Sequence, residues 1–272
     1  MAAFQSAVWE YYRRHGRRFP WRETVDPYQI LVSEFMLQQT QVSRVEAKYA
    51  EFLQRFPTVQ DLADAAVGEV LVVWQGLGYN RRALNLLQAA KRIVHEHQGR
   101  CPGTMHELMA LPGVGRSTAG AVAAFAFGVA HPFVETNIRA ALVHHFVPPG
   151  VRVSERWLVE AAARVLDVTC ARDWYYALMD YGADLKRTTT GLTARAGGRG
   201  GHGRFAGSRR QLRAQLLRLI LAEPGRRAEA LSHRLQSMAV ADWTEEEIEA
   251  VLAVLEREGF VVKGRDGGLA PA

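Results

Sequence analysis

Apolar residues recur at the three- to four-residue spacing of an amphipathic helix through most of the first 185 positions. Strand-like alternation is almost absent there, and prolines and glycines separate the apolar runs. Val8, Tyr11 and Tyr12 share one face of a first predicted helix. The same spacing predicts ten further helices, over Tyr28–Gln41, Arg44–Arg55, Thr58–Ala65, Gly68–Val73, Arg81–His95, Met105–Ala110, Ser117–Phe127, Glu135–His145, Ser154–Val165 and Trp174–Tyr181. We therefore expect residues 1–186 to form one all-α domain.

The pattern changes after position 186. No acidic residue lies between Asp184 and Glu223, whereas nine Lys or Arg residues do. Residues 187–208 are rich in Gly, Thr and Arg, which predicts a basic linker, either a solvated tether or a contact with a nucleic-acid backbone. Three predicted helices and a hairpin-like tail follow, over Arg210–Ala222, Ala228–Gln236, Thr244–Glu258 and Gly259–Leu269. Residues 209–272 thus predict a small winged-helix-like (α+β) domain, which either binds nucleic acid or serves only for packing.

Composition narrows the choice of partner. The 272 residues are 48% hydrophobic and 23% charged, which is typical of a globular protein, and the net charge is +6. Only four of the 34 basic residues are lysines, and arginine favours planar contact with phosphate, so nucleic acid fits better than a membrane surface. The two cysteines, Cys101 and Cys170, are too few for a disulfide framework, and we expect a reducing cytosol. We expect no signal peptide and no membrane span, because no apolar run approaches about 18 residues.

The segment Leu111-Pro-Gly-Val-Gly-Arg-Ser-Thr-Ala-Gly120 is the most informative motif. A helix ends near Pro112, two glycines form a tight turn, and a helix of small residues begins near Ser117. Such a turn directs backbone N–H groups and the positive end of a helix toward a phosphate. Gly113 and Gly115 have no side chain, which lets a phosphate backbone approach closely. Taken alone, the two glycines would also fit a plain turn between helices.

The whole string resembles the helix-hairpin-helix of base-excision DNA glycosylases. Four further strings extend the resemblance over about residues 4–185, namely Phe19–Arg22, Leu31–Val42, Gly76–Tyr79 and Met179–Ala183. Together they resemble the MutY-type adenine glycosylase branch of the HhH-GPD family. The resemblance implies a two-lobed helix-hairpin-helix fold and an enzyme, a DNA N-glycosylase acting on double-stranded DNA.

The resemblance assigns the catalytic residues. Glu34 is the only acid within the apolar stretch Tyr28–Leu37, so burial is expected to raise its pKa, and the family's general acid occupies this position. The family has an aspartate where this chain has Glu135, whose extra methylene moves the carboxylate by about 1–1.5 Å. That change leaves three interpretations open: a retuned catalytic acid, an altered substrate, or lost activity. Asn137 and Ser117 are expected to orient water or backbone.

The DNA-binding residues are also implied by the resemblance. The Gln-Gln pair is expected to work at the lesion, Tyr79 to wedge between bases, and the hairpin to anchor phosphate. The predicted set comprises Gln38, Gln39, Thr40, Tyr79, Leu111, Gly113, Val114, Gly115 and Arg116.

Two departures from the wider family bear on the chemistry. Bifunctional relatives carry a Schiff-base lysine at the position of Ser117, so we expect base removal without efficient strand cleavage. Many relatives hold an iron–sulfur cluster through four cysteines, whereas Lys186 occupies the first ligand position here and no cysteine follows. We therefore expect no cluster and no other cofactor. The pairs His144–His145 and His95–His97 lack partners at ligand spacing, so no metal is expected.

These features predict a monofunctional DNA N-glycosylase of base excision repair that removes adenine mispaired with 8-oxoguanine or G. The long C-terminal domain with which many adenine glycosylases read 8-oxoguanine is not found in this sequence. Excision of another lesion (uracil, thymine in a G·T mispair, or hypoxanthine) and a catalytically inactive DNA-binding protein therefore remain alternatives. We expect a cytoplasmic protein, nucleoid-associated in a bacterium, that encloses one lesion as a monomer.

Overall fold

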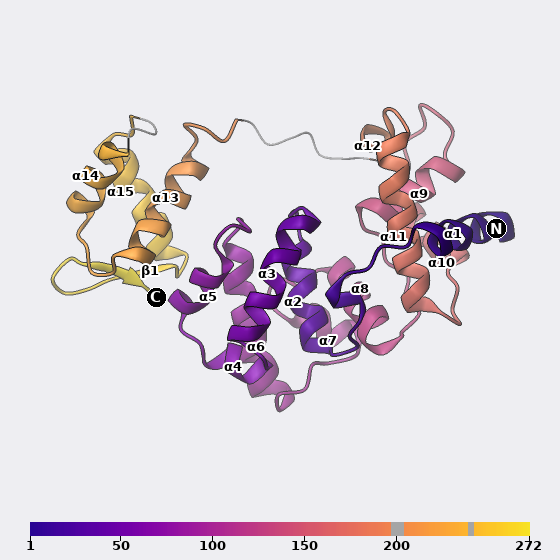
Figure 1. Cartoon of the computed structure of the whole chain (residues 1–272), viewed down its shortest axis with the longest axis horizontal. Coiled ribbons are helices and arrows are strands. Elements are labelled where there is room, and N and C mark those ends of the chain that lie inside the picture. Colours follow the sequence, from indigo (N-terminus) through magenta and orange to yellow (C-terminus); the bar gives the residue numbers. More distant parts are fainter. Residues whose placement is uncertain (197–203, 239–241) are drawn as a thin grey trace. The chain divides into compact units, whose positions relative to one another are not determined.

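A computed structural model of the chain describes residues 1–196, 204–238 and 242–272 (Figure 1). The helices are α1 (Ala2–His15), η1 (Pro20–Arg22), α2 (Pro27–Leu37), α3 (Val42–Arg55), α4 (Val59–Asp64), α5 (Val67–Trp74), α6 (Arg81–His97), α7 (Met105–Ala110), α8 (Arg116–Phe127), α9 (Thr136–Phe146), α10 (Glu155–Val165), α11 (Ala171–Thr188), α12 (Leu192–Arg195), α13 (Arg209–Ala222), α14 (Ala228–Ser237) and α15 (Glu245–Arg257). The strands are β1 (Val261–Lys263) and β2 (Leu269–Pro271). The predicted fold class, all-α with a small C-terminal α+β part, is confirmed for the described residues. Among the described residues, no helix has the length and apolar character needed to cross a membrane.

The chain forms two compact units. The first unit comprises residues 1–49 and 92–200, and the second comprises residues 50–91 and 201–272. The units do not follow chain order, because residues 50–91 belong with the C-terminal residues. The predicted division of the sequence into residues 1–186, 187–208 and 209–272 concerns segments of the chain and not compact units, and it stays a prediction.

The first unit is built around α11. This helix packs against α1, α8 and α9, while α2 packs against α8, and Figure 1 shows α1, α9 and α10 grouped around it. Its core contains the fully buried aromatic side chains of Trp174, Tyr175, Phe125 and Phe133. Aromatic rings bury large apolar areas, so this cluster supplies much of the packing that fixes the helix positions.

Two glycines let elements of the first unit approach closely. A Cβ atom on Gly182 of α11 would lie 2.0 Å from the carbonyl oxygen of Asn137 at the start of α9. A Cβ atom on Gly120 of α8 would lie 2.6 Å from the Cβ of Phe133. A real Cβ atom cannot come so close. Glycine at these two positions therefore allows the start of α9 to lie near α11 and the Phe133 segment to lie against α8.

The structure shifts two predicted helix ends. Helix α2 ends at Leu37 instead of Gln41, because Gln39 adopts a left-handed backbone with φ of 57° that a helix cannot contain. Helix α11 runs to Thr188, well past the predicted end at Tyr181. Its longer C-terminal part carries residues that the site uses.

The first part of the predicted linker belongs to the first unit. Helix α12 packs against α9 and α11, with Leu192 and Ala196 buried. The Arg195 guanidinium donates a hydrogen bond of 2.9 Å to the carbonyl oxygen of Val147. Residues 187–196 are therefore packed structure, and residues 197–203 of the predicted linker lie outside the described residues.

In the second unit, α13, α14 and α15 precede an antiparallel hairpin that pairs Val261 with Pro271. This is the order of elements predicted for residues 209–272. The core includes the fully buried side chains of Leu216, Ile220, Leu255 and Phe260. Helix α13 also contacts α5.

Candidate active site

Glu34 lies in the middle of α2, next to the fully buried Phe35, and its own side chain is only partly exposed. The Asp26 side chain starts this helix by accepting hydrogen bonds from its first backbone N–H groups. Burial raises the pKa of Glu34 to about 8, the negative charge of Glu135 adds to the increase, and the positive charge of Arg22 opposes it. The carboxyl group therefore holds a proton at neutral pH.

Glu135 is the N-cap of α9. Its Oε1 accepts hydrogen bonds of 2.7 Å from the backbone N–H groups of Asn137 and Ile138, and its Oε2 accepts one of 3.2 Å from Asn137 Nδ2. Burial raises the pKa of Glu135, while the two backbone hydrogen bonds and the charges of Lys186 and Arg17 limit the increase. Because all three hydrogen bonds come from N–H donors, they stabilise the ionised form.

Lys186 joins this group from the C-terminal part of α11. Its Nζ donates a hydrogen bond of 3.0 Å to Asn137 Oδ1. Sequence reasoning noted Lys186 only as the residue at a missing cluster-ligand position. Its contact with the site could not be read from the sequence, because 49 positions separate the two residues.

The residues present do not fit an iron–sulfur cluster. The side chain at the expected first ligand position is the Lys186 ammonium, a hydrogen-bond donor already engaged with Asn137. The two cysteines lie elsewhere: Cys101 precedes α7 and Cys170 precedes α11.

Asp180 and Arg22 form a second polar cluster that the sequence did not predict. The Arg22 guanidinium donates two hydrogen bonds of 2.8 Å to the Asp180 carboxylate. The backbone N–H and the side-chain Nε of Arg17 donate two more to the same carboxylate, of 2.8 and 2.7 Å. Burial alone would raise the pKa of Asp180, but the hydrogen bonds and charges of the two arginines outweigh it and lower the pKa. Arg22 also lies over the Tyr176 ring, 4.4 Å from its centroid. This cluster ties the Phe19–Arg22 string to the Met179–Ala183 string.

The predicted hairpin joins α7 to α8. Gly113 has a φ of 77°, which favours glycine, whereas Gly115, the N-cap of α8, has an ordinary φ of −87°. A Cβ atom on Gly115 would meet no protein atom within 4 Å. Leu111 and Val114 are buried and support the turn, so only their backbone groups remain to face a ligand. The positive φ thus explains glycine at 113, whereas neither backbone conformation nor packing within the protein explains glycine at 115.

The end of α2 reaches the hairpin. Gln38 Nε2 donates hydrogen bonds of 3.2 Å to Thr118 Oγ1 and 3.4 Å to the Gly113 carbonyl oxygen. Gln39 is exposed and Thr40 partly exposed in the turn that follows. Arg116 is exposed and Ser117 partly exposed in the first turn of α8. The structure therefore brings the Gln-Gln motif and the hairpin together.

Tyr79 belongs to the second unit. It is 44% exposed and has a φ of 48°, a strained value for a residue other than glycine. The Arg82 guanidinium lies 5.4 Å from the centroid of its ring and donates a hydrogen bond of 3.1 Å to the Gly78 carbonyl oxygen. Trp74 Nε1 donates to the same oxygen at 3.1 Å. The hydrogen bonds from Trp74 and Arg82 to Gly78 thus fix the turn, while the Tyr79 ring is exposed to solvent.

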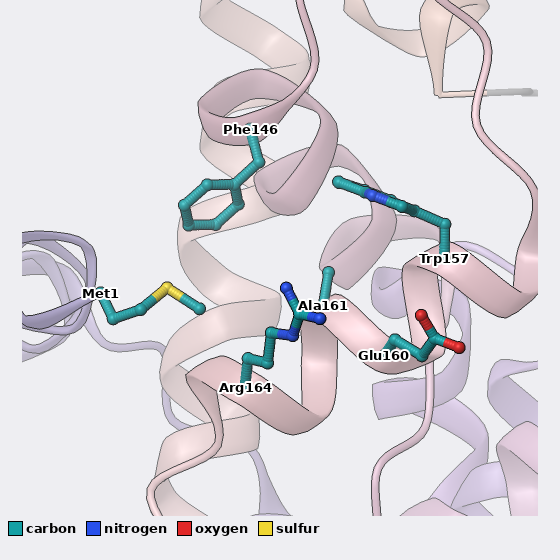
Figure 2. Close-up of a pocket in the computed structure, with 6 residues that line it drawn as sticks. All are labelled: Met1, Phe146, Trp157, Glu160, Ala161 and Arg164. Carbon is teal, nitrogen blue, oxygen red and sulfur yellow. The ribbon is translucent and has the colours of Figure 1, made fainter.

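No predicted site residue lines the hollow drawn in Figure 2. This hollow of about 110 Å³ is lined by Met1, Phe146, Trp157, Glu160, Ala161 and Arg164. Within the described residues, no group of three His, Cys, Asp or Glu side chains is placed to hold a metal ion. His145 instead contacts the Tyr181 hydroxyl at 2.8 Å and the Phe4 ring.

Comparison with known proteins is consistent with this geometry. Residues 32–169 match the family described as "HhH-GPD superfamily base excision DNA repair protein". The chain is 43% identical to an adenine DNA glycosylase of Mycolicibacterium smegmatis over 63% of this chain and 59% of that protein. It is 37% identical to the Homo sapiens adenine DNA glycosylase over 68% of this chain and 36% of that protein.

The fold is similar to solved structures as well. A thermostable thymine-DNA glycosylase superposes with a TM-score of 0.65 at 27% identity, over 72% of this chain and 92% of that one. An endonuclease III–DNA covalent intermediate, at 18% identity and a TM-score of 0.57, shares the fold. The chain matches less than two thirds of the length of the adenine glycosylases named here. With the family match covering half of its residues, this chain belongs to the HhH-GPD superfamily of base excision DNA repair proteins.

Proposed function

We propose that this protein is a monofunctional DNA N-glycosylase that removes adenine mispaired with 8-oxoguanine or G from double-stranded DNA. The observation that carries the proposal is a pair of carboxyl groups, on α2 and at the start of α9, that lie in different hydrogen-bonding environments. Glu34 keeps its proton up to a pH of about 8, and Glu135 accepts three N–H hydrogen bonds that favour its ionised form. Two carboxyl groups whose environments separate their protonation states are suited to an acid and a charge stabiliser.

In this mechanism the duplex is bent and the target base leaves the stack. Glu34 donates its proton to a ring nitrogen of the adenine, which turns the base into a good leaving group. The ionised Glu135 stabilises the positive charge that develops on the sugar as the glycosidic bond breaks. Asn137 and Ser117 orient the water that then attacks the sugar, so the products are free adenine and an abasic site.

The DNA contacts follow from the exposed surface of the hairpin and turns. Backbone N–H groups around Gly113 and Gly115 bind a phosphate at the start of α8. Gln38 and Gln39 contact the lesion site, and Tyr79 inserts between bases from its held turn. The open space at Gly115 supports this interpretation, because packing within the protein does not require a glycine there.

The reaction is expected to stop at the abasic site. Ser117 occupies the hairpin position where a Schiff-base nucleophile would stand, and a hydroxyl cannot form the imine that β-elimination needs. No iron–sulfur cluster, other cofactor or metal takes part. The enzyme would act as a monomer in the cytoplasm, on chromosomal DNA.

The test uses excess protein and single turnover on three duplexes, with A opposite 8-oxoG, A opposite G, and T·A. Hot alkali converts abasic sites to strand breaks, and strand cleavage without alkali reports any lyase activity. We expect alkali-dependent breaks at the mispaired adenine, lost in Glu34→Gln and strongly reduced in Glu135→Ala. Tight binding without breaks in any duplex would contradict the proposal and favour a catalytically inactive DNA-binding protein.

A second candidate is excision of a mispaired pyrimidine. It is favoured by the thymine-DNA glycosylase likeness, which covers 92% of that chain, against 59% or less of the two adenine glycosylases compared above. Duplexes with G·T and G·U separate the two candidates. Breaks only at the pyrimidine would replace adenine by thymine or uracil as the substrate.

A further inference from the structure

Lys186 is a charged residue in the C-terminal part of α11 to which the proposed mechanism gives no role. Its side chain turns to the site, where Nζ donates a hydrogen bond of 3.0 Å to Asn137 Oδ1. The contact joins the C-terminal part of α11 to the first turn of α9. Gly182, four residues earlier on α11, brings the two backbones together at the same crossing.

An asparagine amide can point either way, because its oxygen and nitrogen differ little in shape. A lysine ammonium can only donate, so Lys186 requires the Asn137 oxygen on its own side. The Asn137 nitrogen must then face Glu135, where it donates 3.2 Å to Oε2. If the amide were reversed, its oxygen would face the Glu135 carboxylate and the hydrogen bond would become a repulsion between acceptors.

We propose that Lys186 is a positioning residue that acts through Asn137 to hold the Glu135 carboxylate in its catalytic orientation. The inference rests on the proposed function, because it concerns the carboxylate that faces the sugar. Two cations and one titratable acid interact electrostatically with the Glu135 carboxylate: Lys186 from α11, Arg17 from the segment after α1, and Glu34 from α2. Of these, Lys186 alone is joined to Glu135 through the Asn137 side chain, among the hydrogen bonds of the described residues.

This arrangement bears on the extra methylene of Glu135. A longer side chain has one more rotatable bond than aspartate, so its carboxylate needs more support to stay in one place. Two backbone N–H groups hold Oε1, and the oriented Asn137 amide holds Oε2. Lys186 thereby supports the direction of the Asn137 amide, and through it the position of Glu135 Oε2.

The test compares Lys186→Met with Lys186→Arg and with Arg187→Met as a matched control. Arg187 is the next residue of α11 and pairs with Asp184, so its removal costs the same charge without touching Asn137. We expect Lys186→Met to lower the single-turnover excision rate by about 10-fold, with Kd for an abasic duplex and Tm little changed. Lys186→Arg should recover most of the rate, and Arg187→Met should keep it within about twofold.

The acid limb of the rate–pH profile separates positioning from a merely structural role. Loss of the Lys186 charge raises the pKa of Glu135, so the limb should move to higher pH in Lys186→Met but not in Arg187→Met. An unchanged rate and profile in Lys186→Met would overturn the proposal. So would a covalent protein–DNA adduct trapped by borohydride on an abasic duplex and lost in Lys186→Met, since Lys186 would then be a nucleophile.

A readout independent of catalysis keeps the proposal testable if the proposed function fails. The side-chain amide resonances of Asn137 in ¹⁵N-labelled protein should shift in Lys186→Met and stay in place in Arg187→Met. If wild-type protein excises no base, the proposed function is wrong and these resonances alone decide the role of Lys186. Resonances that are the same in wild type and Lys186→Met would contradict it.

Discussion

At the scale of single residues, Glu34 links the protein's stability to its chemistry. Burial in the fold raises the pKa of its carboxyl from the ordinary 4.5 to about 8. Between these values the unfolded chain releases the proton and the folded protein keeps it, so the free energy of unfolding falls as pH rises from about 4.5 to about 8. Keeping Glu34 protonated in the buried site therefore lowers the free energy of unfolding at neutral pH. Such a loss of stability is common at residues that function requires.

Glu34→Gln should stabilise the fold and abolish excision together. Glutamine has almost the same shape and no charge to desolvate, so we expect the free energy of unfolding at pH 8 to increase by about 1–3 kcal/mol. The gain should vanish near pH 4.5, and the excision rate should fall by at least about 100-fold. Urea unfolding at both pH values measures the first effect. A variant no more stable than wild type at pH 8 would show that Glu34 is solvated in the folded protein.

The wild-type enzyme should lose rate on the alkaline side. Because Glu34 acts in its protonated form, single-turnover excision of mispaired adenine should decline above a pH of about 8. The decline should follow the loss of one proton, while Kd for an abasic duplex changes little. A rate that stays constant up to pH 10 would remove Glu34 from the role of general acid.

The sequence alone was enough to predict some of the site residues but not the contacts between distant ones. Glu34 could be found because it is the only acid in an apolar helix, and its raised pKa was expected from that fact alone. The Asp180–Arg22 pair and the Lys186–Asn137 pair could not, because they join residues 158 and 49 positions apart. Such contacts depend on how helices cross, and helical periodicity gives no information about crossings.

At the scale of elements, two glycines should separate packing from DNA binding. Gly182→Ala places a Cβ 2.0 Å from the Asn137 carbonyl oxygen, so α9 and α11 must move apart. We expect a loss of about 3 kcal/mol in the free energy of unfolding and a loss of excision.

Gly115→Ala meets only open space, so the free energy of unfolding should stay within about 0.5 kcal/mol of wild type while Kd for duplex DNA rises. Urea denaturation measures the stability of both variants, and fluorescence anisotropy measures their binding to duplex DNA. A Gly115→Ala variant as unstable as Gly182→Ala would contradict the expected difference between the two glycines.

The turn before α6 offers a similar separation. Tyr79 holds a φ of 48°, where glycine is relaxed and alanine remains strained. Tyr79→Gly should be more stable than Tyr79→Ala by about 1 kcal/mol, and both should excise more slowly because the wedge is missing. Thermal unfolding and single-turnover assays on duplexes check this. Excision equal to wild type in both variants would show that Tyr79 is not the wedge.

Element boundaries show where sequence reasoning fell short. Residues 38–41 are polar and contain no helix-breaking glycine or proline, so the sequence did not reveal the left-handed turn at Gln39 that ends α2. The Gly, Thr and Arg content after Thr188 indicated a linker, yet the buried side chains of Leu192 and Ala196 pack α12 against the first unit. Composition averages over a segment, whereas packing depends on single apolar side chains.

At the scale of the whole molecule, the C-terminal segments carry opposite charges. Residues 204–238 hold eight arginines and two glutamates, whereas residues 242–258 hold seven acids and one arginine. Arg209, Arg210, Arg218 and Arg234 of α13 and α14 are exposed, and a groove beside them is lined by Arg226, His233 and Arg234 together with Glu223, which pairs with Arg226. Helix α15, third in the domain, presents glutamates instead and would repel phosphate.

If this domain binds DNA, the α14 side should do so. Exchange of Arg226 and Arg234 for alanine should lower the salt dependence of duplex binding, with the slope of log K against log salt decreasing by up to about 2. Exchange of Glu245 and Glu249 for glutamine should not lower that slope. Anisotropy titrations between 50 and 200 mM salt provide the measurement. Identical slopes for wild type and the arginine variant would instead support a domain that serves only for packing.

The docking of α12 has a consequence for how the protein is made. Leu192 and Ala196 close the end of the first unit through apolar contacts, and Arg195 anchors them to the Val147 carbonyl oxygen. These groups all come from the polypeptide itself, so this end of the unit can close as soon as the chain has left the ribosome. We expect cell-free translation in iron-depleted extract to yield fully folded protein, without any cluster-assembly machinery.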